Sequence, residues 1–167
     1  MKQQLAFDFI VNKEEKTIHI SREFAADLAL VWRAWTTPEM LDKWWGPQPW
    51  RAETKSMDFR EGGSWLYAMV GPEGERHWSK STFVAITEER SFSFRSGFSD
   101  EEGNLNPDMP QNLWENKFIP RADRVQVDML LVYDSLEDLE KEIAMGFKEG
   151  MTVDFQQLDA LLATHTK

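Results

Sequence analysis

The sequence predicts an α+β domain in which a curved antiparallel sheet wraps around one long helix near the C-terminus. Much of the stretch from Trp50 to Tyr133 alternates between apolar and polar side chains, which is the pattern of half-buried strands. After Ser135, apolar residues recur at steps of three and four as far as Leu162, which indicates an amphipathic helix. A helix of this length spans roughly 45 Å and can cross a whole sheet.

Length and composition indicate one domain that covers residues 1–167. The chain has no cysteine, which excludes disulfides and thiol catalysis and fits a cytoplasmic location. The start, Met1–Gln4 followed by an apolar run that Asp8 interrupts, does not fit a secretory signal. No segment approaches the roughly 20 apolar residues of a membrane span.

The charge balance is acidic, with 29 Asp and Glu against 19 Lys and Arg. Because such a surface repels phosphate backbones, we expect no nucleic-acid partner. The same charge can simply keep the protein in solution, or it can guide docking onto a basic protein partner. A possible protein partner therefore stays open.

The first elements are predicted to be a hairpin. Apolar and polar residues alternate on both sides of the polar break Asn12–Glu15, so residues 1–16 hold an extra N-terminal strand. The edge formed by Leu5–Val11 could pair with a second copy or be covered within its own sheet. Both a monomer and a homodimer therefore remain open.

Two short helices follow the hairpin. Asp27 is a suitable N-cap for the first, whose apolar residues recur at helical spacing. Pro38 suits the first position of the second helix, and Gly46-Pro47 ends it after two adjacent tryptophans. Five of the eight tryptophans lie between Trp32 and Trp50, which indicates either a dense core corner or the wall of an apolar cavity.

The strand region contains one long interruption. Gly71–Gly74 has the chemistry of a hairpin turn, whereas residues 97–112 form a long acidic loop with Gly and Pro. Ordered loops of this length often act as lids, although an insertion without function is an equally good interpretation.

The last helix is predicted to run from residue 135 to residue 163, with Ser135 as its cap. Gly146 and Gly150 lie inside it, and each costs about 1 kcal/mol relative to Ala. We therefore expect a bend or a close backbone approach at these glycines.

No catalytic or metal-binding constellation is evident. The three histidines lack metal-ligand spacing, so we predict neither a metal nor a cofactor. An enzyme on this fold would need a carboxylate, tyrosine or arginine that faces the enclosed space. The candidates are Glu53, Tyr67, Arg95 and Glu115.

Aromatic and thioether side chains are the strongest functional signal. Each one alone is more often simple core, but together they predict an apolar pocket between the sheet and the last helix. The predicted ligand-binding residues are Trp45, Trp65, Tyr67, Met69, Trp78, Phe94, Trp114, Phe118, Phe147 and Met151.

Several motifs, in order, resemble one known family. They are Val31–Thr36, Trp44–Pro47, Asp58–Gly63, Gly71–Gly74 and Phe98–Asn104, followed by Gly150-Met151 in the last helix. In this order the chain resembles the family of activators of the heat-shock-protein-90 ATPase, within the START-related, birch-pollen-allergen-like (SRPBCC) superfamily.

The resemblance implies a helix-grip fold with a hydrophobic cavity between sheet and helix, and little about activity. It favours non-catalytic binding of a small hydrophobic or aromatic molecule. A chaperone-linked protein-interaction module and a small cavity enzyme of the cyclase, dehydratase or hydrolase type are the alternatives. Met151 stands where the family usually has Trp, which exchanges a rigid wall for a flexible one.

Overall fold

The computed structural model describes residues 5–165, so the beginning of the predicted N-terminal segment, residues 1–4, lies outside the described residues. It is an α+β fold with one antiparallel sheet of strand order β1-β2-β8-β7-β6-β5-β4-β3. The strands are β1 (Phe7–Asn12), β2 (Thr17–Phe24), β3 (Arg51–Met57), β4 (Ser64–Val70), β5 (Arg76–Thr87), β6 (Ser91–Ser99), β7 (Gln111–Pro120) and β8 (Val125–Tyr133). The helices are α1 (Leu28–Thr36), α2 (Pro38–Trp44), α3 (Leu136–Ala144) and α4 (Phe147–His165).

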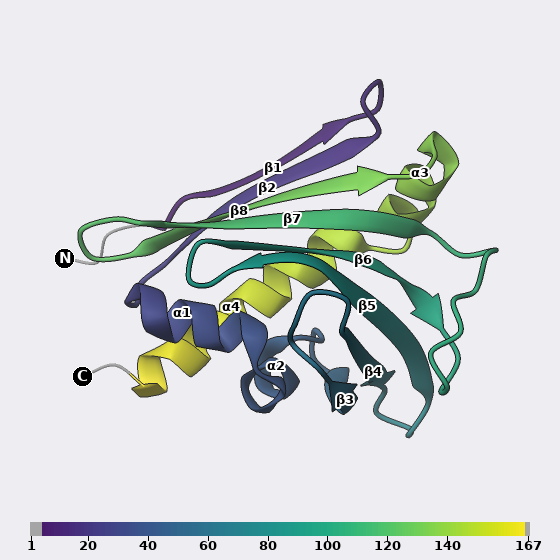
Figure 1. The fold of residues 1–167 in the computed structure, drawn as a ribbon, viewed down its shortest axis with the longest axis horizontal. Helices are drawn as coiled ribbons and strands as arrows, with labels where there is room; N and C mark the ends of the chain where they lie inside the picture. The colour runs from purple at the N-terminus through teal and green to yellow at the C-terminus, as the bar shows by residue number, and fades with distance from the viewer. Residues whose placement is uncertain (1–4, 166–167) are drawn as a thin grey trace.

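The sheet curves around α4, as the helix-grip prediction requires. Figure 1 shows α4 running diagonally across the sheet, from α3 at one end towards α1 at the other. Strand β8, near the middle of the sheet, alternates strictly between buried and partly buried positions. Its buried side chains, such as Met129 and Leu131, belong to the same hydrophobic core as Phe155 and Leu158 of α4.

The predicted helix starts are confirmed. Asp27 accepts a hydrogen bond from the Leu30 amide at 2.8 Å, and Ser135 accepts one from the Asp138 amide at 3.0 Å. Each bond satisfies an amide that the first turn of a helix leaves without an intrahelical acceptor. Pro38 occupies the first turn of α2, as predicted.

Two predicted boundaries need correction. The single helix expected over residues 135–163 is two helices, separated at Met145 and at Gly146, whose φ of +87° is unfavourable for other residues. The loop expected over residues 97–112 is shorter, because β6 continues to Ser99 and β7 begins at Gln111. Isolated pairing of Ser99 with Leu105 also orders part of the remaining segment.

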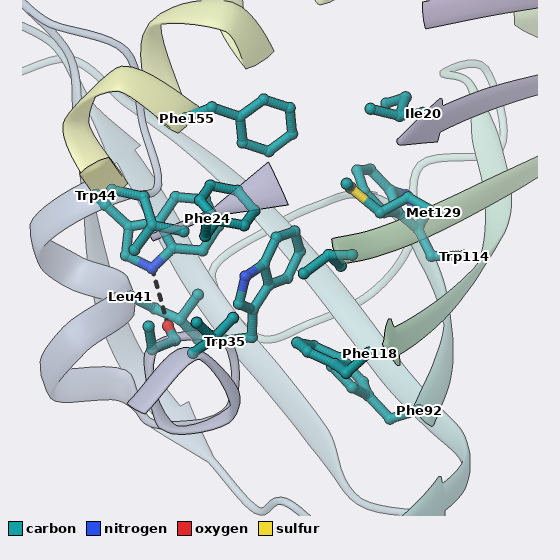
Figure 2. Close-up of a cluster of buried hydrophobic side chains, with 14 of the residues drawn as sticks. Ile20, Phe24, Trp35, Leu41, Trp44, Phe92, Trp114, Phe118, Met129 and Phe155 are labelled. Carbon is teal, nitrogen blue, oxygen red and sulfur yellow. Dashed lines mark hydrogen bonds between the residues drawn. The ribbon is translucent and has the colours of Figure 1, made fainter. Parts of the chain in front are cut away.

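One end of the space between sheet and helix is filled by aromatic rings. We call this region the aromatic corner and define it as Trp32 together with five residues labelled in Figure 2, which are Phe24, Trp35, Trp44, Phe118 and Phe155. Trp35 lies at its centre, with ring centroids 4.9 Å from Trp44 and 5.9 Å from Phe118. The indole of Trp44 donates to the Ala34 carbonyl at 2.8 Å, so a fully buried N–H is satisfied.

Candidate functional site

The tight turn after α2 is bound to α4 by side-chain hydrogen bonds. The Gly46 amide donates to Oδ1 of Asp154 at 3.1 Å, and Nε2 of Gln157 donates to the carbonyls of Trp44 and Gly46 at 3.0 and 2.9 Å. A Cβ on Gly46 would lie 2.8 Å from the Ala52 amide nitrogen, and φ is +114°. Glycine is therefore required here, and the turn holds Trp45 against the interior.

A cavity of about 530 Å³ lies beside this turn, between the sheet and the α3–α4 region. Ligand sites for small molecules commonly enclose about 300–1,000 Å³, so the volume suits such a ligand. Its apolar wall consists of Trp45, Pro47, Trp50, Met69, Phe98, Met109, Pro110, Trp114, Met145, Phe147 and Met151, together with the aromatic ring of Tyr67.

The tryptophan-rich segment from Trp32 to Trp50 contributes both to a dense core corner and to the wall of a cavity, the two alternatives that its sequence left open. Trp32, Trp35 and Trp44 belong to the aromatic corner, whereas Trp45 and Trp50 line the cavity. Adjacent residues thus separate at the end of α2: Trp44 belongs to the filled corner and Trp45 to the cavity wall.

Six of the ten predicted cavity residues line the cavity. Trp45 contacts two strands of the sheet. Its indole donates to the hydroxyl of Tyr67 on β4 at 3.1 Å, and its ring centroid lies 5.9 Å from that of Trp114 on β7. Trp114 in turn lies 6.1 Å from Phe147 at the start of α4. The six are Trp45, Tyr67, Met69, Trp114, Phe147 and Met151.

Three other predicted residues support this wall or the neighbouring corner. Trp65 stacks on Tyr67 with centroids 4.0 Å apart, and Phe94 stacks on Trp114 at 5.5 Å. Phe118 belongs to the aromatic corner and lies 5.0 Å from Trp32. None of the three is among the residues that line the cavity.

Trp78 is placed on the opposite face of the sheet. Its neighbours His77 and Ser79 line the cavity, and alternate residues of a strand point to opposite faces. The Lys55 ammonium lies 5.8 Å from the Trp78 ring centroid on that outer side. The inward positions of this part of β5 are thus polar. The prediction that Trp78 lines the cavity was wrong because it relied on side-chain size rather than on strand alternation.

The candidate acid–base residues divide in the same way. Tyr67 lines the cavity, whereas Glu53 pairs with Arg51 and Arg76 in solvent-exposed bridges. Arg95 pairs with Asp134 at 2.9 Å, also in an exposed bridge, and Glu115 is exposed. Only Tyr67 of the four can therefore contact a molecule in the cavity.

Two carboxylates that the sequence did not single out line the cavity. Glu142 of α3 accepts hydrogen bonds at Oε1 from the Tyr133 hydroxyl at 3.0 Å and from Nδ2 of Asn112 at 3.3 Å. Burial raises the pKa of Glu142 to about 7, although the bonds from Tyr133 and Asn112 oppose the shift. The nearby charge of Asp138 adds to the increase.

Asp154 of α4 is the second carboxylate, with only 4% of its surface exposed. Burial raises its pKa to about 8, and the hydrogen bond from the Gly46 amide opposes that shift. Burial also raises the pKa of Tyr67 to about 12, with smaller increases from the charges of Asp154 and Glu142. Both carboxylates therefore act on the same tyrosine from the helical side of the cavity.

Helical spacing could have revealed Asp154. It lies three residues after Met151 and directly before Phe155, inside the apolar stripe of α4. A charged residue on such a stripe is unusual. Glu142 carries a weaker signal, because it lies among exposed acidic residues of α3 and only the course of that helix brings it to the cavity.

Residues 5–165 contain no group of three or more His, Asp or Glu side chains placed to hold a metal ion. Within the same residues, no helix is both long enough and apolar enough to cross a membrane.

A curved sheet that grips a C-terminal helix and leaves a lined cavity defines a helix-grip domain of the START-related class. The profile of the family described as activator of Hsp90 ATPase homolog 1-like protein matches residues 25–163. This chain belongs to that family. No protein with a curated functional description matches it.

Solved structures from bacteria show the same fold over nearly the whole chain. Protein Ms6760 from Mycobacterium smegmatis is 33% identical, with a TM-score of 0.86 over 95% of this chain and 97% of that one. A protein from Arthrobacter aurescens is 30% identical, with a TM-score of 0.88 over 94% and 91% of the two chains. Protein NE0264 from Nitrosomonas europaea is 26% identical, with a TM-score of 0.80 over 90% and 96%.

Proposed function

We propose that this protein binds a small, largely apolar or aromatic molecule in the cavity beside Trp45 and Trp114, without changing it chemically. The observation that carries the proposal is a cavity of about 530 Å³ whose wall is mainly aromatic rings and methionines. A concave, mostly apolar enclosure with a few polar groups is the usual form of a small-molecule site.

The wall combines fixed and adaptable surfaces. Trp114 is buried and stacked on Phe94, so its ring presents a rigid surface. Met69, Met109, Met145 and Met151 also line the cavity, and methionine side chains adjust to irregular shapes. This combination supports recognition of a flat apolar group while tolerating variation around it.

Binding can be tested in two ways. Native mass spectrometry of protein purified from its own host should show a bound small molecule, and a panel of fluorescent fatty acids and flavonoids should show saturable binding. Phe147→Asp introduces a charge into the wall and should weaken binding by about tenfold or more. Val84→Asp is the matched control, because Val84 is 52% exposed and lies outside the cavity. Neither a co-purified molecule nor saturable binding would contradict the proposal.

A proton-transfer enzyme is the second candidate, and Glu142 is the observation that favours it. A carboxyl group with a pKa raised to about 7 can donate or accept a proton near neutral pH. Mass spectrometry of a bound molecule before and after incubation distinguishes the two functions. Recovery of the unchanged molecule supports binding alone, whereas a product that Glu142→Gln fails to form supports the enzyme.

A further inference from the structure

We infer that the molecule bound in this cavity is an amphipathic amine, with an aromatic or apolar body and a cationic nitrogen that donates hydrogen bonds to Asp154 and Glu142. This inference rests on the proposed binding function and specifies the class of ligand. It follows from the kind of polar groups in the wall, from the carboxylate oxygens that accept no hydrogen bond from the described residues, and from the absence of a lysine or arginine among the described residues that line the cavity.

The polar part of the wall is rich in acceptors and poor in cations. Two carboxylates, from Glu142 and Asp154, face the cavity, and no lysine or arginine is among the described residues that line it. The remaining polar side chains are Tyr67, His77, Ser79, Ser96 and Asn112. A ligand carboxylate or phosphate would therefore meet two acidic groups and no fixed positive charge.

Asn112 positions one of the two carboxylates in the wall. Its side chain is 97% buried, and its Nδ2 donates to Glu142 at 3.3 Å. Its Oδ1 is buried without any hydrogen-bond partner among the described residues. That oxygen has almost no accessible surface, so a molecule in the cavity does not reach it, and Asn112 acts on the ligand through the hydrogen bond that it donates to Glu142.

The carboxylates also retain acceptor capacity. Asp154 uses Oδ1 for the Gly46 amide, and the described residues give its Oδ2 no hydrogen bond. Glu142 accepts both of its hydrogen bonds at Oε1, which leaves Oε2 for another donor. An ammonium group has three N–H donors, so it has enough donors to pair with the remaining oxygens of both carboxylates.

The aromatic wall also suits a cation. Trp45 and Trp114 lie next to each other in the wall, with centroids 5.9 Å apart. Indole is the best of the aromatic side chains for cation–π attraction, and the effect is larger in a desolvated site. The apolar body of an amine would contact the same rings and the methionines, so both parts of the ligand find a matching surface.

The inference predicts that amine affinity depends on pH, because the charge of Glu142 and Asp154 depends on pH. The groups that face them come from every side of the cavity and are Tyr67 on β4, His77 on β5, Asn112 on β7, Tyr133 on β8 and Asp138 on α3, with the Gly46 amide beside Asp154. Because burial raises the pKa values of Glu142 and Asp154, both are largely protonated at pH 6 and release protons to pair with a cation. Amine binding should therefore tighten as the pH rises to 9.

Three probes with one skeleton separate the possibilities: naphthylethylamine, naphthylethanol and naphthylacetate. We expect all binding to be saturable where it occurs, with naphthylethylamine about tenfold tighter than naphthylethanol at pH 9. Naphthylacetate should bind most weakly. The preference for the amine over the alcohol should shrink at pH 6, while the affinity for naphthylethanol stays nearly constant.

Variants assign the effect to the carboxylates. Asp154→Asn and Glu142→Gln should each lower the preference for naphthylethylamine over naphthylethanol at pH 9 by about fivefold. Glu149→Gln on α4 and Glu140→Gln on α3 are matched controls, because both residues are exposed on the same helices. If a variant fails to fold, the pH profile of the unaltered protein still decides.

The outcomes distinguish this inference from the function on which it rests. Binding of naphthylethanol without preference for the amine, or preference for naphthylacetate, would overturn the amine inference and leave the binding function standing. Failure of all three probes, with saturable binding of the fatty-acid and flavonoid panel, would overturn the amine inference alone, whereas failure of the probes and of the panel, with no co-purified molecule, would overturn both.

Discussion

The aromatic corner and the cavity are built from the same kinds of residue, yet one is filled and the other is hollow. In the corner, Trp35 contacts rings from α2, β2, β7 and α4. In the cavity wall, Trp114 stacks on Phe94 and has Trp45 and Phe147 at 5.9 and 6.1 Å, which is as near as most rings around Trp35, but Trp114 also borders the cavity. The aromatic residues are alike, so the difference must come from what the opposing helices supply.

Helix α4 places large apolar side chains against the aromatic corner and smaller or polar ones beside the cavity. Facing the corner, α4 presents Phe155 and Leu158, both fully buried. Facing the cavity, the same helical region presents Asp154, Gly150 and, across the break, Glu142. Phe147 and Met151 keep apolar bulk in this stretch, but Gly150 and the two acidic residues interrupt it, and space for a ligand results.

The strongest test of this comparison truncates the same residue type in both regions of one helix. Phe155→Ala should lower the free energy of unfolding by about 4 kcal/mol, because it leaves a cavity in closely packed surroundings. Phe147→Ala should cost only about 1 kcal/mol, because Phe147 is half-buried and already borders empty space. Urea denaturation measures both. Equal losses would show that the two regions are packed alike.

The second test concerns the buried acid of the cavity. The pKa of Asp154 is raised to about 8 in the folded protein from an ordinary value of 3.8, so the folded state holds its proton over a pH range in which the unfolded state releases it. Its contribution to stability is therefore fully present below pH 4 and is lost as the pH rises to about 8.

Asp154→Asn removes this titration while keeping the acceptor for the Gly46 amide. The variant should match the unaltered protein near pH 4 and exceed it by about 3 kcal/mol at pH 6, which lies about two pKa units above the ordinary value of 3.8, since each unit corresponds to about 1.4 kcal/mol; the difference should grow further up to pH 8. Thermal or urea unfolding across this pH range checks the result. A constant difference between the proteins would contradict the raised pKa. Asp123→Asn, on an exposed loop, is the control.

The comparison also explains what the sequence could predict. Strand alternation, the caps Asp27 and Ser135, and the stripe of α4 are local patterns that predicted the order of strands and helices, and the resemblance to a known family supplied the helix-grip arrangement. The division between Trp44 and Trp45 was not predictable in this way. It depends on Asp154 and Gln157, more than a hundred residues later, which hold the turn against α4.

The polar residues of the cavity were not predicted, because aromatic and methionine content indicates only the apolar part of a wall. On β5 the inward positions near the cavity are His77 and Ser79, while the larger Trp78 faces outward. Parity from the buried Phe83 on the same strand would have placed Trp78 correctly. Glu142 offered no comparable signal, because acidic residues on a surface helix are ordinarily solvated.

The smallest expected effects concern the two glycines of the α3–α4 region, and they test how the break in the helix preserves the cavity. Gly146→Ala should cost about 1 kcal/mol, because Gly146 has a φ of +87° that a side chain disfavours. Gly150→Ala should be neutral or stabilise α4 by up to about 1 kcal/mol, because its new methyl group meets only Pro47 at an ordinary 3.5 Å. Chemical denaturation separates the two signs.

The two glycine variants also test which part of the cavity wall contacts the ligand. Gly150 lines the cavity, so its methyl group should weaken binding of a bulky probe even where it stabilises the fold. Gly146 does not line the cavity, so its substitution should change stability with little direct effect on affinity. A Gly150→Ala variant that gained stability and kept full affinity would show that the ligand does not reach this part of the wall, and would confine binding to the side near Trp45 and Trp114.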